Sequence, residues 1–335
     1  MPPVNWTRHA AEADFALRAV TAAAGICRAA QQEARRWAQR KPDASPVTEA
    51  DFASQALIGG WLAEAFPHDP LIAEEDSQTL EAEMGLAGRV LARLEPLRPE
   101  ADEDSVRRWL DHGARPPGDR FWALDPIDGT KGFLRGGQYV VALALIEEGQ
   151  VVVAALAAPS LAPDLRPVVA QEGCAAVAVR GEGAWVMPLD GGAARRLSAS
   201  GRADASRARL VCSFEDEHTD WPAITRLRHA LGLTAEPIRM DSQAKYLIVA
   251  GGEADLLVRL LPQAQPGYKE KIWDVAAGTL IVEEAGGRVT DLVGRSLDLT
   301  TGRELTRNQG GLVTNGQVHE AVLQALRAER LGGEG

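Results

Sequence analysis

The chain has 335 residues, of which 45% are hydrophobic and 25% are charged. These proportions predict a folded globular protein of about two domains, and they exclude collagen-like, coiled-coil and wholly disordered chains. Its 36 basic and 47 acidic side chains give a formal net charge of −11, so we expect no nucleic-acid partner. An anionic substrate must therefore be bound by local basic groups or by a metal ion.

The cysteines and the N-terminal residues predict where the protein resides. Cys27, Cys174 and Cys212 are far apart and odd in number, which fits neither a set of disulfides nor a paired-cysteine metal site. We therefore expect a reducing compartment. Residues 1–18 carry charges among their apolar side chains, and they indicate neither a signal peptide nor a membrane span. The sequence thus predicts a cytoplasmic protein without a membrane partner.

The first third of the chain is predicted to be mainly helical. Two helices are expected, over residues 6–40 and 45–66, because the first has apolar side chains near helical spacing and prolines close both segments. Residues 71–73 form a short apolar run that predicts a buried strand, and three acids at residues 74–76 follow it directly. Residues 79–120 are charged and again helical in character.

Short strands follow, first in a meander and then alternating with helices. The change comes after Gly191-Gly192, and it predicts an N-terminal α+β domain of residues 1–193 and a C-terminal α/β domain of residues 194–335. The two runs on either side of residues 147–150 predict a hairpin. The expected strands of the meander are residues 121–124, 139–146, 151–156, 175–179 and 184–187. Those of the second domain are residues 210–212, 237–240, 255–260 and 311–314.

Residues 124–136 form the segment that is richest in chemical groups. Its Asp-Pro-Ile-Asp-Gly run places two carboxylates around a proline that fixes the backbone, so Asp125, the Ile127 carbonyl and Asp128 can converge on one point. Hard cations such as Mg²⁺ take oxygen ligands of this kind, together with water and substrate phosphate. A bare run of these five residues is more often an ordinary turn. The surrounding thirteen residues favour the metal site.

Five blocks of the sequence, in the same order, resemble the lithium-sensitive, magnesium-dependent phosphatases of the inositol monophosphatase superfamily. The block at residues 124–136 is highly specific for that superfamily. Its Thr-Lys-Gly-Phe-Leu-Arg continuation and the Asp-Ser-Gln-Ala-Lys-Tyr run from Asp241 are most similar to 3'(2'),5'-bisphosphate nucleotidases. The five blocks are residues 45–51, 73–76, 124–136, 240–246 and 269–278.

This resemblance implies a fold, a cofactor and a reaction. The implied fold has two domains in αβαβα layers, like other sugar phosphatases, and the implied cofactor is two or three Mg²⁺ ions. In the family, water polarised by metal attacks phosphorus without a phosphoenzyme, and Asp51 and Thr130 match the pair that orients this water. Most of the implied metal ligands lie in the first domain and the last one lies in the second. These ligands are Glu74, Asp125, the Ile127 carbonyl, Asp128 and Asp274.

The resemblance also implies a phosphorylated small molecule as substrate. The leading expectation is that 3'-phosphoadenosine 5'-phosphate loses its 3'-phosphate to give AMP. Lys245 matches the position that approaches the second phosphate or the nucleoside, and its compact ammonium suits phosphate oxygens. Two alternatives stay open, a phosphatase for inositol monophosphate or a sugar phosphate, and a non-catalytic nucleotide or metal sensor. The further candidates for substrate contacts are Ser242, Gly129, Arg259 and His218.

Several of these residues also have purely structural interpretations. By spacing alone, residues 48–51 fit a capping box, in which Asp51 would stabilise the start of a helix. The acids at residues 74–76 could form a solvated turn, and Asp274 could complement a helix dipole. An exposed polar histidine is the simpler interpretation of His218.

The sequence departs from the family pattern at three positions. Ala73 and Asp76 replace the usual glycine and serine around the Glu-Glu pair, and Val275 replaces the usual histidine after the last ligand. None of these changes removes an expected ligand. Asp76 is expected to add negative charge near the metals, and Val275 is expected to alter the wall beside the substrate.

Overall fold

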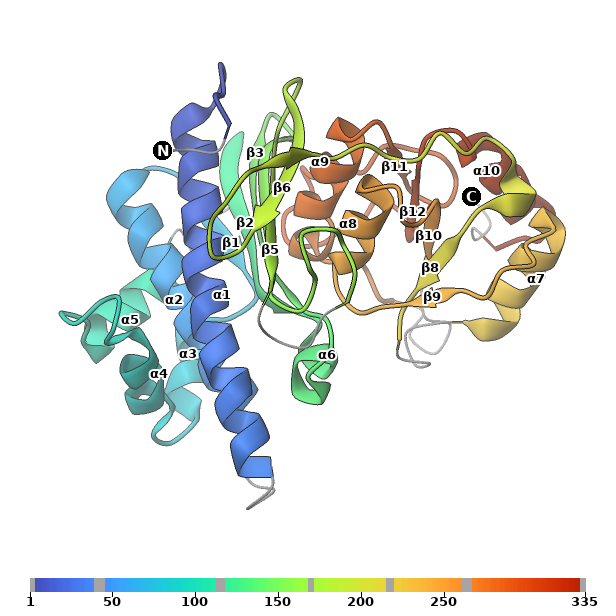
Figure 1. Ribbon diagram of the computed structural model, residues 1–335. Coiled ribbons are helices and arrows are strands. Elements are labelled where there is room, and N and C mark those ends of the chain that lie inside the picture. The colour runs from blue at the N-terminus through green and yellow to red at the C-terminus, as the bar shows by residue number, and fades with distance from the viewer. Residues whose placement is uncertain are drawn as a thin grey trace.

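The computed structural model describes residues 4–38, 46–112, 118–167, 172–214, 220–260 and 267–331. Helices and sheets alternate across the molecule in five layers (Figure 1). A helical layer covers the outer face of a seven-stranded sheet, two helices fill the space between this sheet and a five-stranded one, and two more helices cover the far side. The expected αβαβα layering is confirmed.

The seven-stranded sheet has its strands in chain order. β1 runs parallel to β2, and every other neighbouring pair is antiparallel. The register between β2 and β3 shifts between Asp125 and Asp128, and such a bulge redirects the side chains beside it. The strands are β1 (Leu71–Ala73), β2 (Arg120–Asp128), β3 (Val140–Glu147), β4 (Gln150–Ala158), β5 (Cys174–Val179), β6 (Gly183–Pro188) and β7 (Arg195–Arg196). The meander was predicted, but β2 runs four residues further than expected and β7 was not expected.

Five helices form the outer layer on the N-terminal side. Leu124 and Leu143 belong to the sheet face that packs against α1, while α4 and α5 pack against α2. The helices are α1 (Ala10–Ala38), α2 (Pro46–Ala65), α3 (Ser77–Ala82), α4 (Leu86–Leu94) and α5 (Glu103–Leu110). α1 begins four residues later than the sequence predicts. A short helix, α6 (Thr130–Arg135), follows β2 and was not expected.

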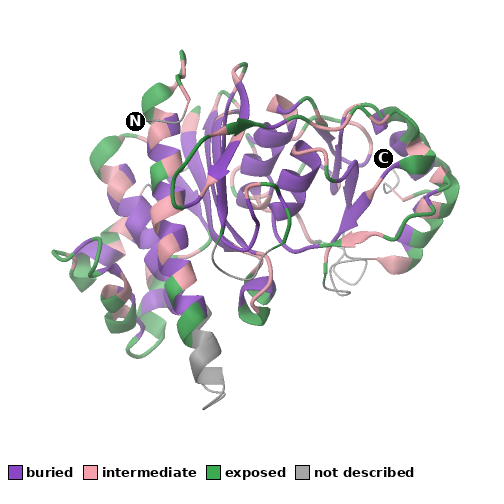
Figure 2. Ribbon diagram, in the orientation of Figure 1, coloured by how far each residue is buried: buried purple, intermediate pink, exposed green. Residues whose placement is uncertain are grey.

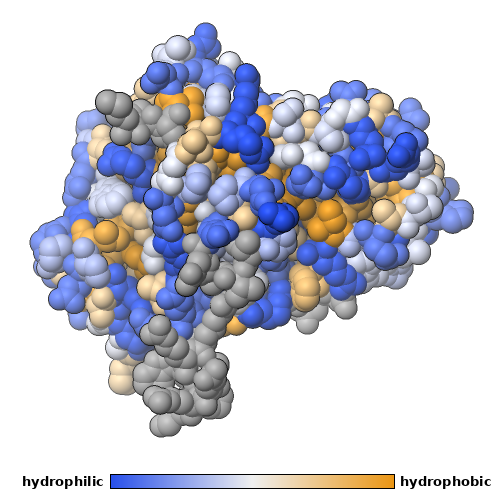
Figure 3. Space-filling model, in the orientation of Figure 1, coloured by the Kyte–Doolittle hydropathy of each residue, from blue (hydrophilic) through white to orange (hydrophobic). Residues whose placement is uncertain are grey.

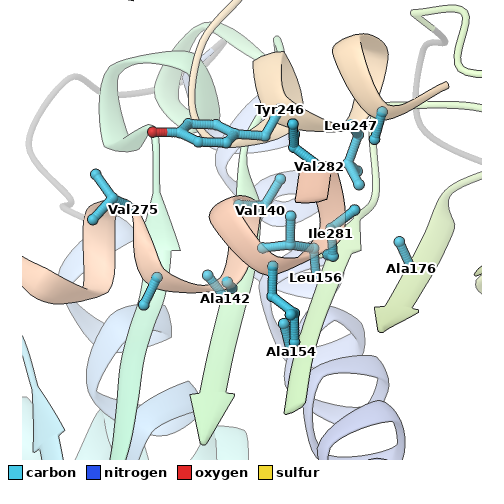
Figure 4. Close-up of a cluster of buried hydrophobic side chains, with 14 of the residues drawn as sticks. Val140, Ala142, Ala154, Leu156, Ala176, Tyr246, Leu247, Val275, Ile281 and Val282 are labelled. Atoms are coloured by element: carbon cyan, nitrogen blue, oxygen red, sulfur yellow. The ribbon is translucent and has the colours of Figure 1, made fainter. Parts of the chain in front are cut away.

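Two helices, α8 (Ala244–Ala250) and α9 (Ala276–Glu284), lie between the sheets, and all seven residues of α8 are buried. Figure 2 shows this central region as the most continuously buried part of the molecule. The sheet face towards these helices carries small side chains such as Ala142 and Ala154, which belong to the same buried cluster as Tyr246 and Ile281 (Figure 4). α8 and α9 cross so closely that a side chain on Gly278 would meet the Tyr246 ring at 2.5 Å. Small residues therefore allow the middle layer to form.

The five-stranded sheet has the order β11-β12-β10-β8-β9. β8, β9 and β10 are parallel, so their carboxyl ends lie at one edge of the sheet, where ligands bind in many α/β proteins. The strands are β8 (Leu210–Cys212), β9 (Ile238–Arg239), β10 (Leu256–Arg259), β11 (Arg288–Thr290) and β12 (Gly311–Thr314). The outer helices are α7 (Trp221–Leu231) and α10 (His319–Ala328). The four strands expected here are present, and β11 was not expected.

The chain passes from the first sheet to the second between β7 and β8. The buried carboxylate of Asp255 fastens this connection, because it accepts hydrogen bonds from Ser200, Arg202 and Arg209. β7 still pairs with β6 just beyond residue 193, and the exact domain boundary stays a prediction.

Hydrophilic side chains cover most of the face shown in Figure 3. None of the helices in the described ranges has the length and apolar character needed to cross a membrane.

His319 connects α10 to both β11 and β12 through a buried hydrogen-bonded chain. The Thr290 hydroxyl donates to the carbonyl of Asp291 at 2.8 Å, so Nε2 of His319 must donate to Thr290 Oγ1 at 3.0 Å. Nδ1 then accepts from the Thr314 hydroxyl at 2.9 Å. This arrangement suits a neutral imidazole. Burial lowers the pKa of His319 to about 4, and the nearby Arg288 acts in the same direction.

This network predicts a pH dependence of stability. Between pH 6.5 and about 4 the unfolded chain binds a proton at this histidine and the folded chain does not, so the free energy of unfolding should fall as the pH falls through this window. In His319→Gln this contribution is absent. Urea unfolding at pH 5, 6 and 7 should therefore give a shallower pH dependence for the variant than for the wild type. Parallel curves would contradict the assignment of a neutral, buried His319.

Candidate active site

Acidic side chains from four segments of the chain influence one another near the bulged end of β2. Asp125 lies within this group and is 3% exposed. Burial raises its pKa well above the usual range, and the carboxylates of four other acids raise it further. These acids are Asp128, Glu74, Asp274 and Asp51. The structure therefore brings the four expected acidic metal ligands and Asp51 into electrostatic contact, although their roles stay predictions.

Asp51 and Asp125 each have one carboxylate oxygen that is buried and accepts no hydrogen bond from the described residues. Asp51 lies on α2, and its pKa is raised well above normal by burial and by Glu75 and Glu74. The capping interpretation of Asp51 is wrong, because α2 already begins at Pro46 and Asp51 lies in its second turn. A buried carboxylate oxygen without a partner is costly unless a cation or proton is bound.

Asp128 and Asp274 are associated with different sheets. Asp128 lies at the end of a strand of the first sheet, and Asp274 lies in the segment between two strands of the second sheet. Asp128 ends β2 and accepts a hydrogen bond from the backbone N–H of Gln243 at 2.6 Å. Asp274 ends the short turn η3 (Ile272–Asp274), directly before α9, and burial raises its pKa to about 7. Arg259, the last residue of β10, opposes this rise from 3.8 Å away. Asp274 also lies where a carboxylate complements the dipole of α9, so this second interpretation stays open.

The acids after β1 are held by their backbones. Gln55 donates to the Glu75 carbonyl at 2.7 Å and accepts from the Glu75 N–H at 2.9 Å. Arg303 donates to the carbonyl of Ala73 at 2.7 Å. The Glu74 side chain remains accessible to solvent, yet desolvation and the charge of Asp128 raise its pKa. Two backbone anchors therefore fix the loop that carries Glu74.

The three departures from the family pattern have clear structural places. Asp76 is the N-cap of α3, and the hydrogen bond from the Thr79 N–H lowers its pKa. Its charge still raises the pKa of Glu75, so the expected electrostatic effect reaches that neighbour. Val275 is buried at the start of α9, and Ala73 ends β1. Asp76 thus serves a local helix.

Gly129, Thr130 and Ser242 lie close together between α6 and α8. Gly129 has a φ of +91°, and a side chain there would meet the Ser242 Cβ at 2.9 Å. Ser242 itself has a φ of +62°, which is strained for a residue with a side chain. The exposed Thr130 directs its hydroxyl at the Ile127 carbonyl, 3.4 Å away. Gly129 and Ser242, which are candidate substrate contacts, therefore lie at the same corner of the site as the Ile127 carbonyl, which is a candidate metal ligand.

Lys245 is the buried cation of the site. Burial and the neighbouring Arg259 lower its pKa to about 8, whereas Asp128 and Asp241 oppose this effect. Within the described ranges, its ammonium makes no hydrogen bond or ion pair. Arg259, by contrast, forms two hydrogen bonds to Glu270, at 3.1 and 2.5 Å. His218 lies outside the described residues.

The donor atoms of the acid cluster decide whether it can bind a metal ion. Among the described residues, no three His, Cys, Asp or Glu side chains are close enough together to hold one metal ion by themselves. The buried oxygens of Asp51 and Asp125 without a partner in the described ranges, and the pKa values that burial and neighbouring acids raise, nevertheless mark a site that a cation would stabilise. Carboxylates, a carbonyl, water and phosphate form the usual Mg²⁺ shell. The residues present therefore fit a hard cation completed by water or substrate.

Some residues of the site were not found from the sequence. Gln243 and Glu270 lie inside two of the motif blocks, but nothing in the sequence indicates that Gln243 contacts Asp128 or that Glu270 binds Arg259. Gln55 has no such signal either. Arg303 lies outside every block, and it stacks on Trp273 with its guanidinium carbon 4.6 Å from the ring centre. Only the fold reveals these contacts, because their partners are distant in sequence.

Charge repulsion in the cluster predicts that Asp125→Asn stabilises the metal-free protein. In chelator, Tm should exceed the wild-type value, and more at pH 8 than at pH 5, because a raised folded-state pKa makes the wild type lose stability as the pH rises. Added Mg²⁺ should stabilise the wild type but not the variant. Asp190→Asn is the control, since Asp190 is exposed and paired with Arg28 at 2.8 Å. A lower Tm for Asp125→Asn at both pH values would contradict this.

Comparison with known proteins agrees with the motif blocks. A model of the inositol monophosphatase family matches residues 6–331. A relative from Oryza sativa named 3'(2'),5'-bisphosphate nucleotidase is 38% identical, and the match covers 95% of this chain and 94% of the relative. A Schizosaccharomyces pombe protein of the same name is 36% identical, with 86% and 85% covered.

Solved structures share the fold at lower sequence identity. Mycobacterium tuberculosis SuhB has a TM-score of 0.64 and 22% identity, covering 98% of this chain and 100% of that one. An inositol monophosphatase from Anabaena has a TM-score of 0.64 and 21% identity, with 96% and 97% covered. The chain therefore belongs to the inositol monophosphatase family, whose members are metal-dependent phosphatases, as its five motif blocks predicted.

Proposed function

We propose that the protein is a Mg²⁺-dependent 3'(2'),5'-bisphosphate nucleotidase that hydrolyses 3'-phosphoadenosine 5'-phosphate to AMP and phosphate. The observation that carries this proposal is a buried cation, Lys245, that acts on Asp128 within a cluster of acids whose pKa values are raised. Such a pairing suits a substrate with one phosphate for metal and a second for an ammonium. The names and high coverage of the relatives support the same substrate class.

The proposed cofactor is two or three Mg²⁺ ions. When bound, Mg²⁺ supplies polarisation of the attacking water and neutralisation of the phosphate oxygens. Gln55 and Arg303 would hold the Glu74 loop in place, and Arg259 would hold Glu270 beside Asp274. The residues proposed to bind the ions are Glu74, Asp125, the Ile127 carbonyl, Asp128 and Asp274.

Asp51 and Thr130 are the proposed pair that orients the attacking water. Oδ1 of Asp51 is buried and has no partner in the described part of the chain, so it can accept a hydrogen bond from that water. Its raised pKa also suits a group that takes up a proton. The Thr130 hydroxyl is exposed and close to the Ile127 carbonyl. In the reaction the water oxygen bonds to phosphorus, and the 3'-oxygen leaves with the electron pair of the broken P–O bond and gains a proton.

The second phosphate is assigned first to Lys245. Arg259 is a weaker candidate than Lys245 because Glu270 already occupies two of its nitrogens. Ser242 and Gly129 form the corner next to Lys245, and His218 is proposed as a further nucleotide contact. Cys27, Cys174 and Cys212 are buried and form no disulfide with one another, which supports the predicted reducing, cytoplasmic compartment.

Thr130→Ala tests the orientation of the water separately from the binding of metal. Loss of the hydroxyl should lower kcat by about 10²-fold, because misplacing one reacting group typically costs that much. The Mg²⁺ concentration for half-maximal activity should stay the same. Thr130→Ser, which keeps the hydroxyl, should retain most of the activity. Unchanged kcat in Thr130→Ala would reduce Thr130 to a turn residue.

Lys245→Met tests both the substrate and the assigned contact, and it keeps the length of the buried side chain. Loss of the charge-assisted contact should lower kcat/KM for 3'-phosphoadenosine 5'-phosphate by about 10- to 100-fold. The values for AMP and inositol 1-phosphate should change much less, because neither offers a second phosphate. The measurement is phosphate release with Mg²⁺ for all three substrates.

Two results of this panel would contradict the proposal. If the wild type prefers inositol 1-phosphate, the nucleotidase function fails and the broader phosphatase function replaces it. If Lys245→Met weakens all three substrates equally, Lys245 does not bind the second phosphate.

A further inference from the structure

Gln243 joins the two halves of the candidate site through one buried residue. Its backbone N–H donates to Asp128 Oδ2 at 2.6 Å, and Asp128 belongs to the first sheet. Its side-chain Nε2 donates to the carbonyl of Trp273 at 3.0 Å, while its Oε1 accepts from the N–H of Gly278 at 2.9 Å. The side chain is fully buried between α8 and α9. One residue therefore contacts Asp128 directly and both sides of the segment that carries Asp274.

The local backbone aims this contact. Ser242, with its φ of +62°, turns the chain so that the next N–H meets Asp128. The Ser242 hydroxyl supports the turn, because it donates to the Asp241 carbonyl at 2.6 Å and accepts from the Ala244 N–H at 3.2 Å. Gly129 leaves the space that this turn needs. Strain that persists in a buried turn is typical of functional sites.

We propose that Gln243 is a positioning residue that fixes the distance between Asp128 and Asp274 and thereby sets the affinity of the site for divalent cations. This inference rests on the proposed function. The carboxylates repel one another, so without a rigid connection they would move apart when no cation is bound. The three hydrogen bonds of Gln243 oppose that movement. Residues that orient metal ligands typically change metal affinity by 10- to 100-fold when replaced.

The uncharged amide suits this task better than an ion pair. A cation at position 243 would compete with the metal for Asp128, and a carboxylate would add to the repulsion. An amide offers both donors and an acceptor, and Gln243 uses its nitrogen and its oxygen on backbone groups of the Asp274 segment. Gln243 thus transmits position without changing the charge of the site.

Gln243→Met is the first test, since it keeps the length and volume of the side chain and removes both of its hydrogen bonds. Thermal unfolding is followed as MgCl2 is added, which measures cation binding without any turnover. The Mg²⁺ concentration for half of the Tm rise should increase at least 10-fold relative to the wild type. In activity assays, kcat should fall at subsaturating Mg²⁺ and recover partly at high Mg²⁺, while KM for the substrate changes little.

Asn315→Leu is the matched control. Asn315 is equally buried, and its amide donates to Ser200 and Arg202 and accepts from two backbone N–H groups, but it holds the connection between the sheets. The control should lower Tm and leave the Mg²⁺ midpoint unchanged. An unchanged midpoint in Gln243→Met would overturn the inference, as would an equal shift in both variants.

Gln243→Glu keeps the inference testable if Gln243→Met does not fold. The carboxylate keeps the acceptor for Gly278 and loses the donor to Trp273, and it adds one negative charge beside the cluster. Charge alone would tighten Mg²⁺ binding, whereas lost positioning weakens it. A higher Mg²⁺ midpoint therefore supports positioning, and a lower or unchanged one overturns it. If the wild type shows neither a Tm rise nor phosphate release with Mg²⁺, the proposed function fails. If the wild type and the variant respond equally to Mg²⁺, only this inference is refuted.

Discussion

Repulsion between neighbouring carboxylates, two of them buried, is the constraint on which the rest of this structure depends. Burial raises the pKa of five acids from α2, the loop after β1, the end of β2 and the turn before α9, and the other four raise the pKa of Asp125 further. In water such a group would separate. In the folded protein the segment that carries each acid holds it in place. The repulsion therefore persists, and bound cations would reduce it.

The groups that hold the acid-bearing segments in place are mainly uncharged or bind the backbone and not the carboxylates. Gln55 and Gln243 hold acid-bearing segments by their backbones, and neither amide adds charge to the cluster. Arg303 binds a backbone carbonyl before Glu74, and its guanidinium stacks on an indole, so its charge opposes the pKa rise of Glu74 only in part. The small residues of the middle layer bring the two sheets close enough for these contacts. The packing of the core therefore determines the geometry of the site in this fold.

The sequence predicted what depends on neighbouring residues. Apolar runs of β1 and β2 ending in acids, the hairpin and the alternating pattern after residue 191 all correspond to observed elements. It mispredicted what depends on tertiary position. The local pattern at Asp51 fits a cap, and only the start of α2 at Pro46 excludes it. The partners of Gln243 and Arg303 are 30 to 230 residues away, and no local pattern encodes such contacts.

Lys245 relates the charge of the acids to the choice of substrate. Burial and Arg259 lower its pKa to about 8, while Asp128 and Asp241 oppose that change. Under the proposed function, a cation on Asp128 cancels part of the negative charge that now favours the protonated lysine. The ammonium then keeps its proton best when another anion approaches, and a substrate phosphate is such an anion. A protein of net charge −11 can thus bind a bisphosphate, because cation and substrate each supply a countercharge that the other requires.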